Sequence, residues 1–333
     1  MKIAQVAAIK ENKASGLSFS IPNLIKGFKA IGIQCDLINL NNKDLDISAL
    51  SSYNIVVLNS FFLLQYLKIL VLVKKKIKII VTPRGAFSSR NHYSLKKRIY
   101  SFLYFFIIKF RNLDVSIHYL TERERELSRF INFPSFVCGN SIQGDDILRL
   151  TDLRKKDLDT ITITYIGRFI PEIKGLDKLI NQVILDQTII RGRKIQINLY
   201  GPNSPYKTYL ERLCKEKNIL DIIFFKGEVF GEKKEEVLRN TDFHILTSRS
   251  EGYPMSVLES LAKGIPQILS EGTNLLSDLE HYNFGVGFDK EVFTKISALN
   301  PQDYHLMCVN ALKYSEMHCV SNIAKKTFEG YLK

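Results

Sequence analysis

The stretch TITITYIGRFIPEIKGLDKLINQVILDQTIIRGRKIQINLYG, residues 160–201, decides the fold class. Its two ends, 160–169 and 194–201, are short runs with repeated Ile, alternating with Thr in the first, and are typical of buried strands. The segment 175–185 between them has the spacing of an amphipathic helix. Strand, helix and strand in this order predict two parallel strands that are joined by a crossover helix.

The same alternation extends over most of the chain. Strand-like runs separated by helical segments lie at 2–9, 35–40, 54–59 and 78–85, and again at 221–229, 242–248 and 266–270. Two such sets in series predict an α/β protein with two doubly wound domains, whose parallel sheets face a central cleft. We place the first domain at 1–155 and the second at 156–315, with the polar segment 150–159 as the linker. We expect residues 316–333 to form a helix that packs back on the first domain.

The composition is that of a folded protein in a reducing compartment. The chain has 333 residues and 45% hydrophobic content, enough for two buried cores. Its five cysteines are scattered without a CxxC pair, which argues against a disulfide framework or a zinc ribbon and fits the cytoplasm. The apolar stretch at the N-terminus is too short for a signal peptide and is typical of a first strand.

Positive charge is concentrated in one stretch. The net charge is +13, and residues 61–111 contain twelve Lys or Arg and no Asp or Glu. The same stretch holds two apolar runs, 61–73 and 101–108, which are both shorter than the roughly 20 residues of a transmembrane helix. Basic residues beside apolar ones suit a surface that binds anionic lipid. The alternative is a buried strand and helix with a solvated basic rim. No nucleic-acid-binding module accompanies the charge, so we expect no nucleic-acid partner.

Two carboxylates stand out in SRSEGYPMSVLESLAKGIPQILS, residues 248–270. A strand ends there, a Gly-Tyr-Pro turn follows, and a helix is predicted to begin near Pro254 or Met255. The start of a helix offers free backbone N–H groups to an anion. Glu251 precedes the helix and Glu259 lies within it, so both carboxylates can reach the same cleft. Carboxylates suit sugar hydroxyls because they accept paired hydrogen bonds. In isolation, each glutamate could equally be surface charge.

Two cations follow the strand at 160–169. Arg168 comes directly after Gly167, and Lys174 precedes Gly175 and the amphipathic helix. Two cations in a strand-to-helix loop can clamp a diphosphate. Taken alone, this pair could also be a solvated loop. The two segments occur together, about 80 residues apart, and this combination favours a ligand site over surface charge.

GRF…KGLDKLI followed by SEGYPMSVLESLAKGIP resembles the retaining glycosyltransferases of family 4, which have the GT-B fold. EGYPMSVLE, residues 251–259, is similar to that family's Glu-x7-Glu motif. The resemblance implies that Arg168 and Lys174 bind the donor diphosphate and that Glu259 holds the nucleotide ribose. It also implies that Glu251 touches the donor sugar, and that the backbone at 253–256 meets sugar and phosphate. Family members need no metal, which agrees with the absence of an Asp-x-Asp motif at a strand end.

The predicted site therefore has two parts. The catalytic residues are Arg168, Lys174 and Glu251. The donor-binding residues are Gly167, Arg168, Lys174, Gly201, Glu251, Gly252, Tyr253, Pro254, Met255, Ser256 and Glu259. No metal ion or other cofactor is expected.

The first half resembles the family only weakly, and it departs from the family pattern in two places. Where the family often has two adjacent glycines, this chain has Ser15 and Gly16. Where many relatives place a His after a central strand, this chain has Arg84, which can bind phosphate or a sugar hydroxyl. The nearest His is His118, which could be either a functional group or a wall residue. These four residues are the predicted acceptor and phosphate loop.

The resemblance implies a retaining, metal-independent transferase that moves a sugar from a nucleotide-sugar to a lipid-linked glycan acceptor. Its expected role is the assembly of a bacterial surface polysaccharide such as O-antigen or capsule. Its expected place is the cytoplasm, on the inner face of the cytoplasmic membrane. The nucleotide is left open among UDP, GDP and dTDP. The alternatives are a GT-B sugar-nucleotide epimerase and a non-catalytic membrane- or nucleic-acid-binding protein on the same scaffold.

Overall fold

The computed structural model of the chain describes residues 1–9, 16–42, 47–89, 93–129, 132–153 and 156–333. The chain divides into two compact units. Unit 1 comprises Met1–Gln143 and His318–Lys333, and unit 2 is Gly144–Met317. The predicted boundary between 155 and 156 therefore falls inside unit 2, and the C-terminal segment belongs to unit 1.

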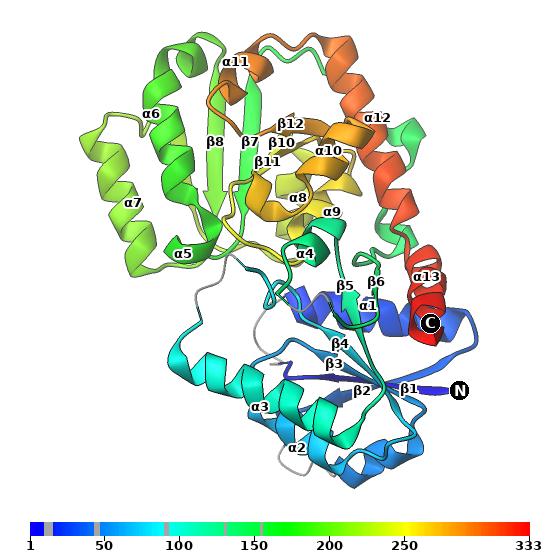
Figure 1. Cartoon of the computed structure of the whole chain (residues 1–333). Coiled ribbons are helices and arrows are strands. Elements are labelled where there is room, and N and C mark those ends of the chain that lie inside the picture. The colour runs from blue at the N-terminus through cyan, green and yellow to red at the C-terminus, as the bar shows by residue number, and fades with distance from the viewer. Residues whose placement is uncertain (10–15, 43–46, 90–92, 130–131, 154–155) are drawn as a thin grey trace. The chain divides into compact units, whose positions relative to one another are not determined.

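Unit 1 is built on a parallel six-stranded sheet in the order β2–β1–β3–β4–β5–β6 (Figure 1). Its strands are β1 (Lys2–Ala7), β2 (Gln34–Asn39), β3 (Ile55–Asn59), β4 (Lys78–Thr82), β5 (Val115–Tyr119) and β6 (Ser135–Val137). Its helices are α1 (Gly16–Ala30), α2 (Leu64–Leu72), α3 (Leu95–Arg111), α4 (Glu122–Glu126) and α13 (Val320–Leu332), with the 3-10 helix η1 (Ile47–Ser52).

Two hydrophobic cores lie on opposite faces of this sheet. Successive residues of β3 alternate between them, because side chains along a strand point to opposite faces. Val56 packs in the core that holds Tyr66 of α2 and Tyr104 of α3. Val57 packs in the core that holds Phe28 of α1 and Tyr331 of α13. Burial on both faces explains why the central strands β3 and β4 are nearly continuous runs of Ile, Val and Leu.

The C-terminal helix α13 is an integral part of unit 1. It packs against α1 at Gly27, where a Cβ would come within 2.7 Å of Val320 and 2.8 Å of Ala324. The hydroxyl of Tyr331 accepts a hydrogen bond from Gln5 Nε2 at 3.2 Å. This segment therefore completes one face of the sheet.

Unit 2 is built on a second parallel sheet, in the order β12–β11–β10–β7–β8–β9. Its strands are β7 (Ile161–Ile166), β8 (Ile195–Tyr200), β9 (Ile223–Lys226), β10 (Phe243–Leu246), β11 (Gln267–Leu269) and β12 (Gly285–Gly287). Its helices are α5 (Pro171–Lys174), α6 (Leu176–Gly192), α7 (Pro205–Glu216), α8 (Gly231–Arg239), α9 (Met255–Leu261), α10 (Leu276–Tyr282), α11 (Val292–Ser297) and α12 (Pro301–Met317), with the 3-10 helices η2 (Gly144–Asp146), η3 (Leu150–Asp152) and η4 (Glu271–Thr273).

The strand order of unit 2 reverses between β7 and β10. The chain runs outward from β7 through β8 to β9, and then returns to place β10 on the other side of β7. Open parallel sheets bind ligands beyond the carboxyl ends of their strands at such a switch point. The two doubly wound α/β units confirm the predicted fold class. Within the described ranges, no helix combines the length and apolar composition that a bilayer crossing requires.

Each unit encloses one histidine that burial keeps neutral. His118 in β5 and His244 in β10 are 3% and 0% exposed. Burial lowers the pKa of each ring from 6.5 to about 4. His244 Nδ1 lies 2.9 Å from Gln267 Oε1. Because the pKa of both rings is lowered, each unit has an uncharged imidazole in its interior at neutral pH.

We predict that both histidines make stability depend on pH between about 6.5 and 4. The unfolded chain takes up a proton below pH 6.5, whereas the folded ring does not until about pH 4. The stabilisation is complete above pH 6.5 and falls by up to about 1.4 kcal/mol per pH unit for each ring as the pH drops through this window. Denaturant unfolding at pH 7, 6 and 5 should show a shallower decline for His244→Gln than for the parent. Identical declines would contradict the assignment.

Candidate functional site

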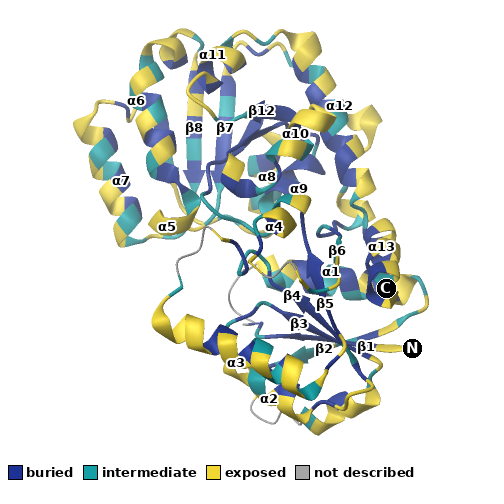
Figure 2. Cartoon of the chain, viewed as in Figure 1, coloured by how far each residue is buried: buried dark blue, intermediate teal, exposed yellow. Residues whose placement is uncertain are grey.

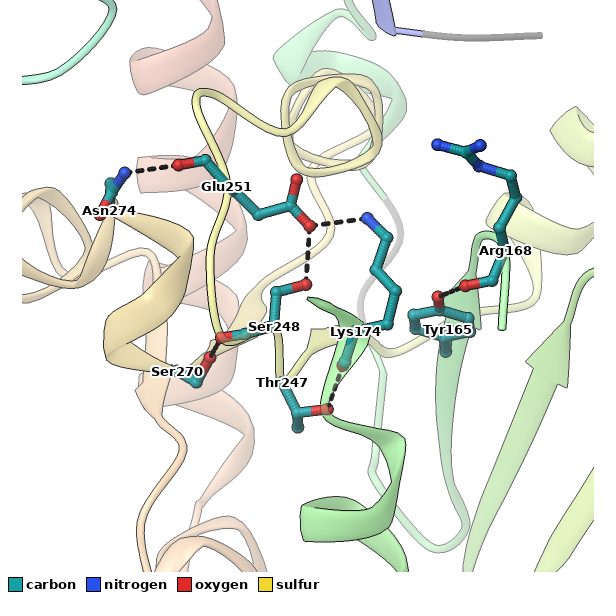
Figure 3. Close-up of polar contacts among 8 residues, drawn as sticks. All are labelled: Tyr165, Arg168, Lys174, Thr247, Ser248, Glu251, Ser270 and Asn274. Carbon is teal, nitrogen blue, oxygen red and sulfur yellow. Dashed lines mark hydrogen bonds and ion pairs between the residues drawn. The ribbon is translucent and has the colours of Figure 1, made fainter. Parts of the chain in front are cut away.

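The loops that leave β7 and β10 meet at the switch point of unit 2. Lys174, at the end of α5, donates from Nζ to Glu251 Oε1 at 2.6 Å (Figure 3). Ser248 Oγ donates to the same oxygen at 2.7 Å. The Lys174 and Glu251 side chains are only 17% and 15% exposed. The structure thus joins the two predicted segments at a cation and a carboxylate that lie 77 residues apart in the chain.

A second ion pair fastens the same two loops. The guanidinium of Arg249 binds both carboxylate oxygens of Asp177, in the first turn of α6, at 2.8 and 2.5 Å. It also donates to Pro171 O at 3.0 Å, while the backbone N–H of Arg249 donates to Ile173 O at 2.6 Å. The guanidinium holds the pKa of Asp177 below its ordinary value. Arg249 and Asp177, which position Lys174 against Glu251, are not among the predicted site residues.

Backbone contacts fix the Glu251 loop on its other side. Asn274 Nδ2 donates to the carbonyl of Glu251 at 2.6 Å, and Ser270 Oγ donates to the carbonyl of Ser248 at 2.7 Å (Figure 3). The backbone N–H of Glu251 donates to Gly272 O at 2.9 Å. With both backbone groups of Glu251 engaged, its carboxylate is held in one place.

Two glycines allow the backbones of these loops to approach each other closely. Gly175 has φ 60°, and a Cβ there would lie 2.1 Å from the carbonyl oxygen of Thr247. Gly201, at the end of β8, is close to the β7 loop, because a Cβ would lie 2.1 Å from the carbonyl oxygen of Gly167. Gly201 was predicted as a donor-site residue, and its visible role is to let the loop after β7 lie against β8.

Arg168 is the exposed cation of the site. Its carbonyl accepts a hydrogen bond from the buried Tyr165 hydroxyl at 2.7 Å, which anchors the backbone (Figure 3). Over the described parts of the chain, its guanidinium takes part in no ion pair or hydrogen bond. Figure 3 shows the guanidinium extending away from the anchored backbone. Arg168 is therefore a charge without a counterion beside a paired cation.

Glu259 lies on α9, which begins at Met255 as predicted. Its Oε2 accepts a hydrogen bond from Lys234 Nζ of α8 at 2.5 Å, and both side chains are about 20% exposed. Lys234 is not among the predicted site residues, because α8 carries several charges and nothing in their spacing singles one out. Lys234 fixes one carboxylate oxygen of Glu259 and leaves the other for a ligand.

The remaining residues of the motif turn their side chains inward. Tyr253, Pro254 and Met255 are buried, and Gly252 and Ser256 are partly buried. The Tyr253 hydroxyl lies 3.3 Å from that of Tyr314, which donates to Asp278 Oδ2 at 2.6 Å. A ligand at this turn would therefore meet the backbone, as the family resemblance implies.

The predicted acceptor residues lie in unit 1. Ser15 lies outside the described residues, and Gly16 is the first residue of α1. Arg84 follows β4 with φ 53° and donates to Asn59 Oδ1 at 3.0 Å, Ser20 Oγ at 3.2 Å and Asn140 Oδ1 at 3.4 Å. Burial lowers the pKa of Arg84 to about 10, so the guanidinium stays charged at neutral pH.

His118 is placed differently from what a substrate contact requires. Its Nε2 lies 2.8 Å from the carbonyl oxygen of Cys138, and its Nδ1 lies 3.5 Å from Thr82 Oγ1. The ring stacks on Phe136 at 4.6 Å. Both nitrogens are engaged within the fold, so of His118 and Arg84 we retain only Arg84 as the candidate acceptor contact.

The described residues include no group of three or more His, Cys, Asp or Glu side chains placed to hold a metal ion. Metal independence remains a prediction, and it is tested below. The arrangement in unit 2 offers two cations and two oriented carboxylates, the chemistry that a diphosphate and a set of sugar hydroxyls require.

Residues 151–297 match the family model of the glycosyl transferases group 1. This segment is a group 1 glycosyl transferase domain. It contains β7, β10, α9 and every residue of the predicted donor site. Protein CapJ of Staphylococcus aureus is 25% identical over 198 residues, which are 58% of this chain and 47% of CapJ. The chain thus spans about half the length of this curated relative. The finer assignment to retaining family 4 stays a prediction.

Solved structures of similar fold cover nearly the whole chain. Sucrose-phosphate synthase (tll1590) from Thermosynechococcus elongatus matches 99% of this chain and 98% of its own, with a TM-score of 0.76 and 15% identity. HepE from Anabaena, solved with UDP and glucose, matches 99% and 98% with a TM-score of 0.70 and 13% identity. At these identities the likeness shows the fold alone. The fold is GT-B, which is also the fold of the group 1 glycosyl transferases.

We predict that Gly201→Ala destabilises unit 2 and Gly192→Ala does not. The new methyl group at 201 would collide with the carbonyl of Gly167, whereas a Cβ at 192 meets nothing within 4 Å. The expected cost at 201 is about 1–3 kcal/mol, and the change at 192 should be neutral or slightly stabilising. Denaturant unfolding of the two variants measures both. Equal stabilities would show that the β7 loop does not depend on the close approach.

Proposed function

We propose that this protein is a retaining glycosyltransferase that moves a sugar from a nucleotide-sugar donor to a glycan acceptor without a metal ion. One observation carries the proposal: the Arg168–Lys174 loop and the Glu-x7-Glu segment are joined at the switch point of a group 1 domain through the Lys174–Glu251 contact. UDP is the first nucleotide to test, because the similar HepE structure holds UDP and glucose.

The donor diphosphate would lie between Arg168 and Lys174. The ammonium of Lys174 has three donors, and its bond to Glu251 uses one, so two remain for phosphate oxygens. Arg168 brings a planar guanidinium that no other described side chain neutralises. These charges would stabilise the negative charge that grows on the departing diphosphate, a role for which the site is organised before reaction.

The two carboxylates would hold the rest of the donor. Glu259, fixed at one oxygen by Lys234, has its other oxygen for the ribose hydroxyls. Glu251, held through Oε1 by Lys174 and Ser248, has Oε2 for a hydroxyl of the transferred sugar. In a retaining transfer the departing phosphate oxygen can accept the proton of the acceptor hydroxyl on the same face of the sugar. The site then needs no strong protein base.

The acceptor would bind to unit 1 near Arg84. Among the described residues, this half-buried guanidinium donates to the neutral oxygens of Ser20, Asn59 and Asn140, while the Glu124 carboxylate favours its charged form. It therefore suits an anionic or hydroxyl-rich acceptor group. We propose a lipid-linked glycan at the inner face of the cytoplasmic membrane, within the assembly of a surface polysaccharide such as O-antigen or capsule. The family match favours this transferase over an epimerase and over a non-catalytic binding protein.

We predict that Glu259→Gln weakens the binding of UDP. Loss of a charged acceptor to the ribose hydroxyls should cost about 1.5–3 kcal/mol, or more than tenfold in Kd. The matched control is Glu235→Gln, which removes a carboxylate from the Lys263–Glu235 ion pair on the neighbouring helix. Isothermal titration calorimetry should show a loss for Glu259→Gln alone. Unchanged affinity in both variants would refute the ribose assignment.

We predict that Arg168→Gln lowers kcat while the folding stability stays unchanged. Arg168 is exposed and meets charge that develops during transfer, so its loss affects the transition state most. Arg191→Gln, which breaks the exposed ion pair between Arg191 of α6 and Asp221 before β9, is the control. Sugar transfer from UDP-glucose should persist in excess EDTA. Activity that disappears with the chelator and returns with Mg²⁺ or Mn²⁺ would exclude the metal-independent mechanism.

A further inference from the structure

Helix α3 of unit 1 has two apolar faces. One face is buried, where Tyr100, Tyr104 and Ile108 pack into the core against the sheet. The other is exposed to solvent, as Figure 2 shows along the outer side of the helix. We name this face the α3 stripe; it consists of Leu95, Ile99, Phe102, Leu103, Phe106 and Phe110. A surface helix of a globular domain ordinarily carries polar residues on its outer face.

The α3 stripe is continuous and ordered. At 3.6 residues per turn, or about 100° per residue, its six residues fall within an arc of about 100°. The rings of Phe102 and Phe106 stack at 6.0 Å, and those of Phe106 and Phe110 stack at 5.8 Å. Phe102 is 69% exposed and Phe110 is 79% exposed. A column of stacked rings in water marks a surface that binds something.

The neighbouring helix α2 extends the apolar surface. Leu64, Val71 and Leu72 of α2 are exposed, and α2 packs beside α3. Arg111 Nη1 donates to Leu70 O at 2.6 Å, which fastens the C-terminal ends of the two helices together. Of the predicted apolar run 61–73, however, Phe61, Tyr66, Ile69 and Leu70 are buried in the core. The expected membrane surface therefore narrows to the α3 stripe and these few residues of α2.

The charges around the α3 stripe indicate which kind of partner binds to it. Exposed Lys96, Arg98 and Lys109 lie on α3, and exposed Lys74, Lys75 and Lys76 follow α2. The sequence from 47 to 113 contains no Asp or Glu. A second copy of the chain would bring two basic surfaces together, which repel each other. An anionic lipid surface offers the opposite charge at its headgroups and an apolar layer beneath them.

We propose that the α3 stripe inserts into the interfacial layer of an anionic membrane, with the flanking Lys and Arg at the level of the headgroups. This inference deepens the proposed function and rests on it, because the lipid-linked acceptor is part of that proposal. α3 follows the loop that carries Arg84, and the Tyr93 hydroxyl, just before the helix, donates to the carbonyl of Ala86 in that loop. Insertion of α3 would thus bring the Arg84 loop to the membrane surface.

The experiment uses the absence of tryptophan from the chain. Phe106→Trp places a single fluorophore in the stripe, and Leu185→Trp places one at an exposed apolar position of α6 in unit 2. Vesicles of phosphatidylcholine with phosphatidylglycerol, or of phosphatidylcholine alone, are titrated into each variant. We expect a blue shift and quenching by brominated acyl chains for Phe106→Trp with the anionic vesicles only, and neither for Leu185→Trp.

A second variant measures how much the rings contribute to binding. Phe102→Gln/Phe106→Gln/Phe110→Gln should lower co-sedimentation with anionic vesicles by more than about tenfold, since each ring buries a large apolar surface on insertion. Leu185→Gln should leave it unchanged. Raised salt should weaken binding without abolishing it, because the apolar part is not screened.

Two results would overturn the proposal directly: no spectral change in Phe106→Trp with anionic vesicles at low salt, or unaltered co-sedimentation of the triple variant. A third would be a dimer of the parent chain that is lost in the triple variant while vesicle binding persists. Calorimetric UDP binding is measured on the same variants. Because the proposed donor site lies in unit 2, retained UDP affinity with lost vesicle binding separates a failure of this inference from a failure of that site.

Discussion

The contact between Lys174 and Glu251 is the constraint on which the site depends. It joins two loops that are distant in sequence, and further contacts hold each loop in the position that this ion pair requires. Arg249 and Asp177 tie the loops together, Gly175 lets one backbone pass beside Thr247, and Asn274 holds the carbonyl of Glu251. The ion pair also keeps both charges satisfied before a ligand arrives, because an unpaired charge at this depth would be costly.

The two units use the same α/β construction for different electrostatic tasks. Unit 2 concentrates paired charges at the switch point between β7 and β10, where a charged small molecule can be oriented. Unit 1 holds the half-buried guanidinium of Arg84 against neutral oxygens, and its stretch 61–111, which includes α2 and α3, has twelve Lys or Arg and no Asp or Glu. This division is consistent with a donor bound by one unit and an acceptor drawn from a lipid surface by the other.

The sequence predicted what depends on local pattern. The period of the apolar residues indicated the parallel strands, and the Gly-Tyr-Pro turn indicated the start of α9 at Met255. The strands β5, β6 and β12 are not among the predicted runs. β6 and β12 are three residues each and lack the apolar run that revealed the equally short β11, and Ser116 and His118 interrupt the apolar residues of β5. Arg249, Asp177 and Lys234 were missed because their importance comes from partners 25 to 72 residues away. The burial of His118 also follows from tertiary packing, here against Phe136, and not from its own segment.

The return of the chain to unit 1 at α13 has a consequence for synthesis. One face of the first sheet is finished only by Ile323, Ala324 and Tyr331, which are translated after the whole of unit 2. Until then Gly27 of α1 and Nε2 of Gln5 lack the contacts that α13 supplies. Unit 2 is contiguous in sequence and has no such dependence. On the ribosome, the second half of the protein can therefore reach its native state first, while the first half waits for its last helix with an apolar surface exposed to chaperones.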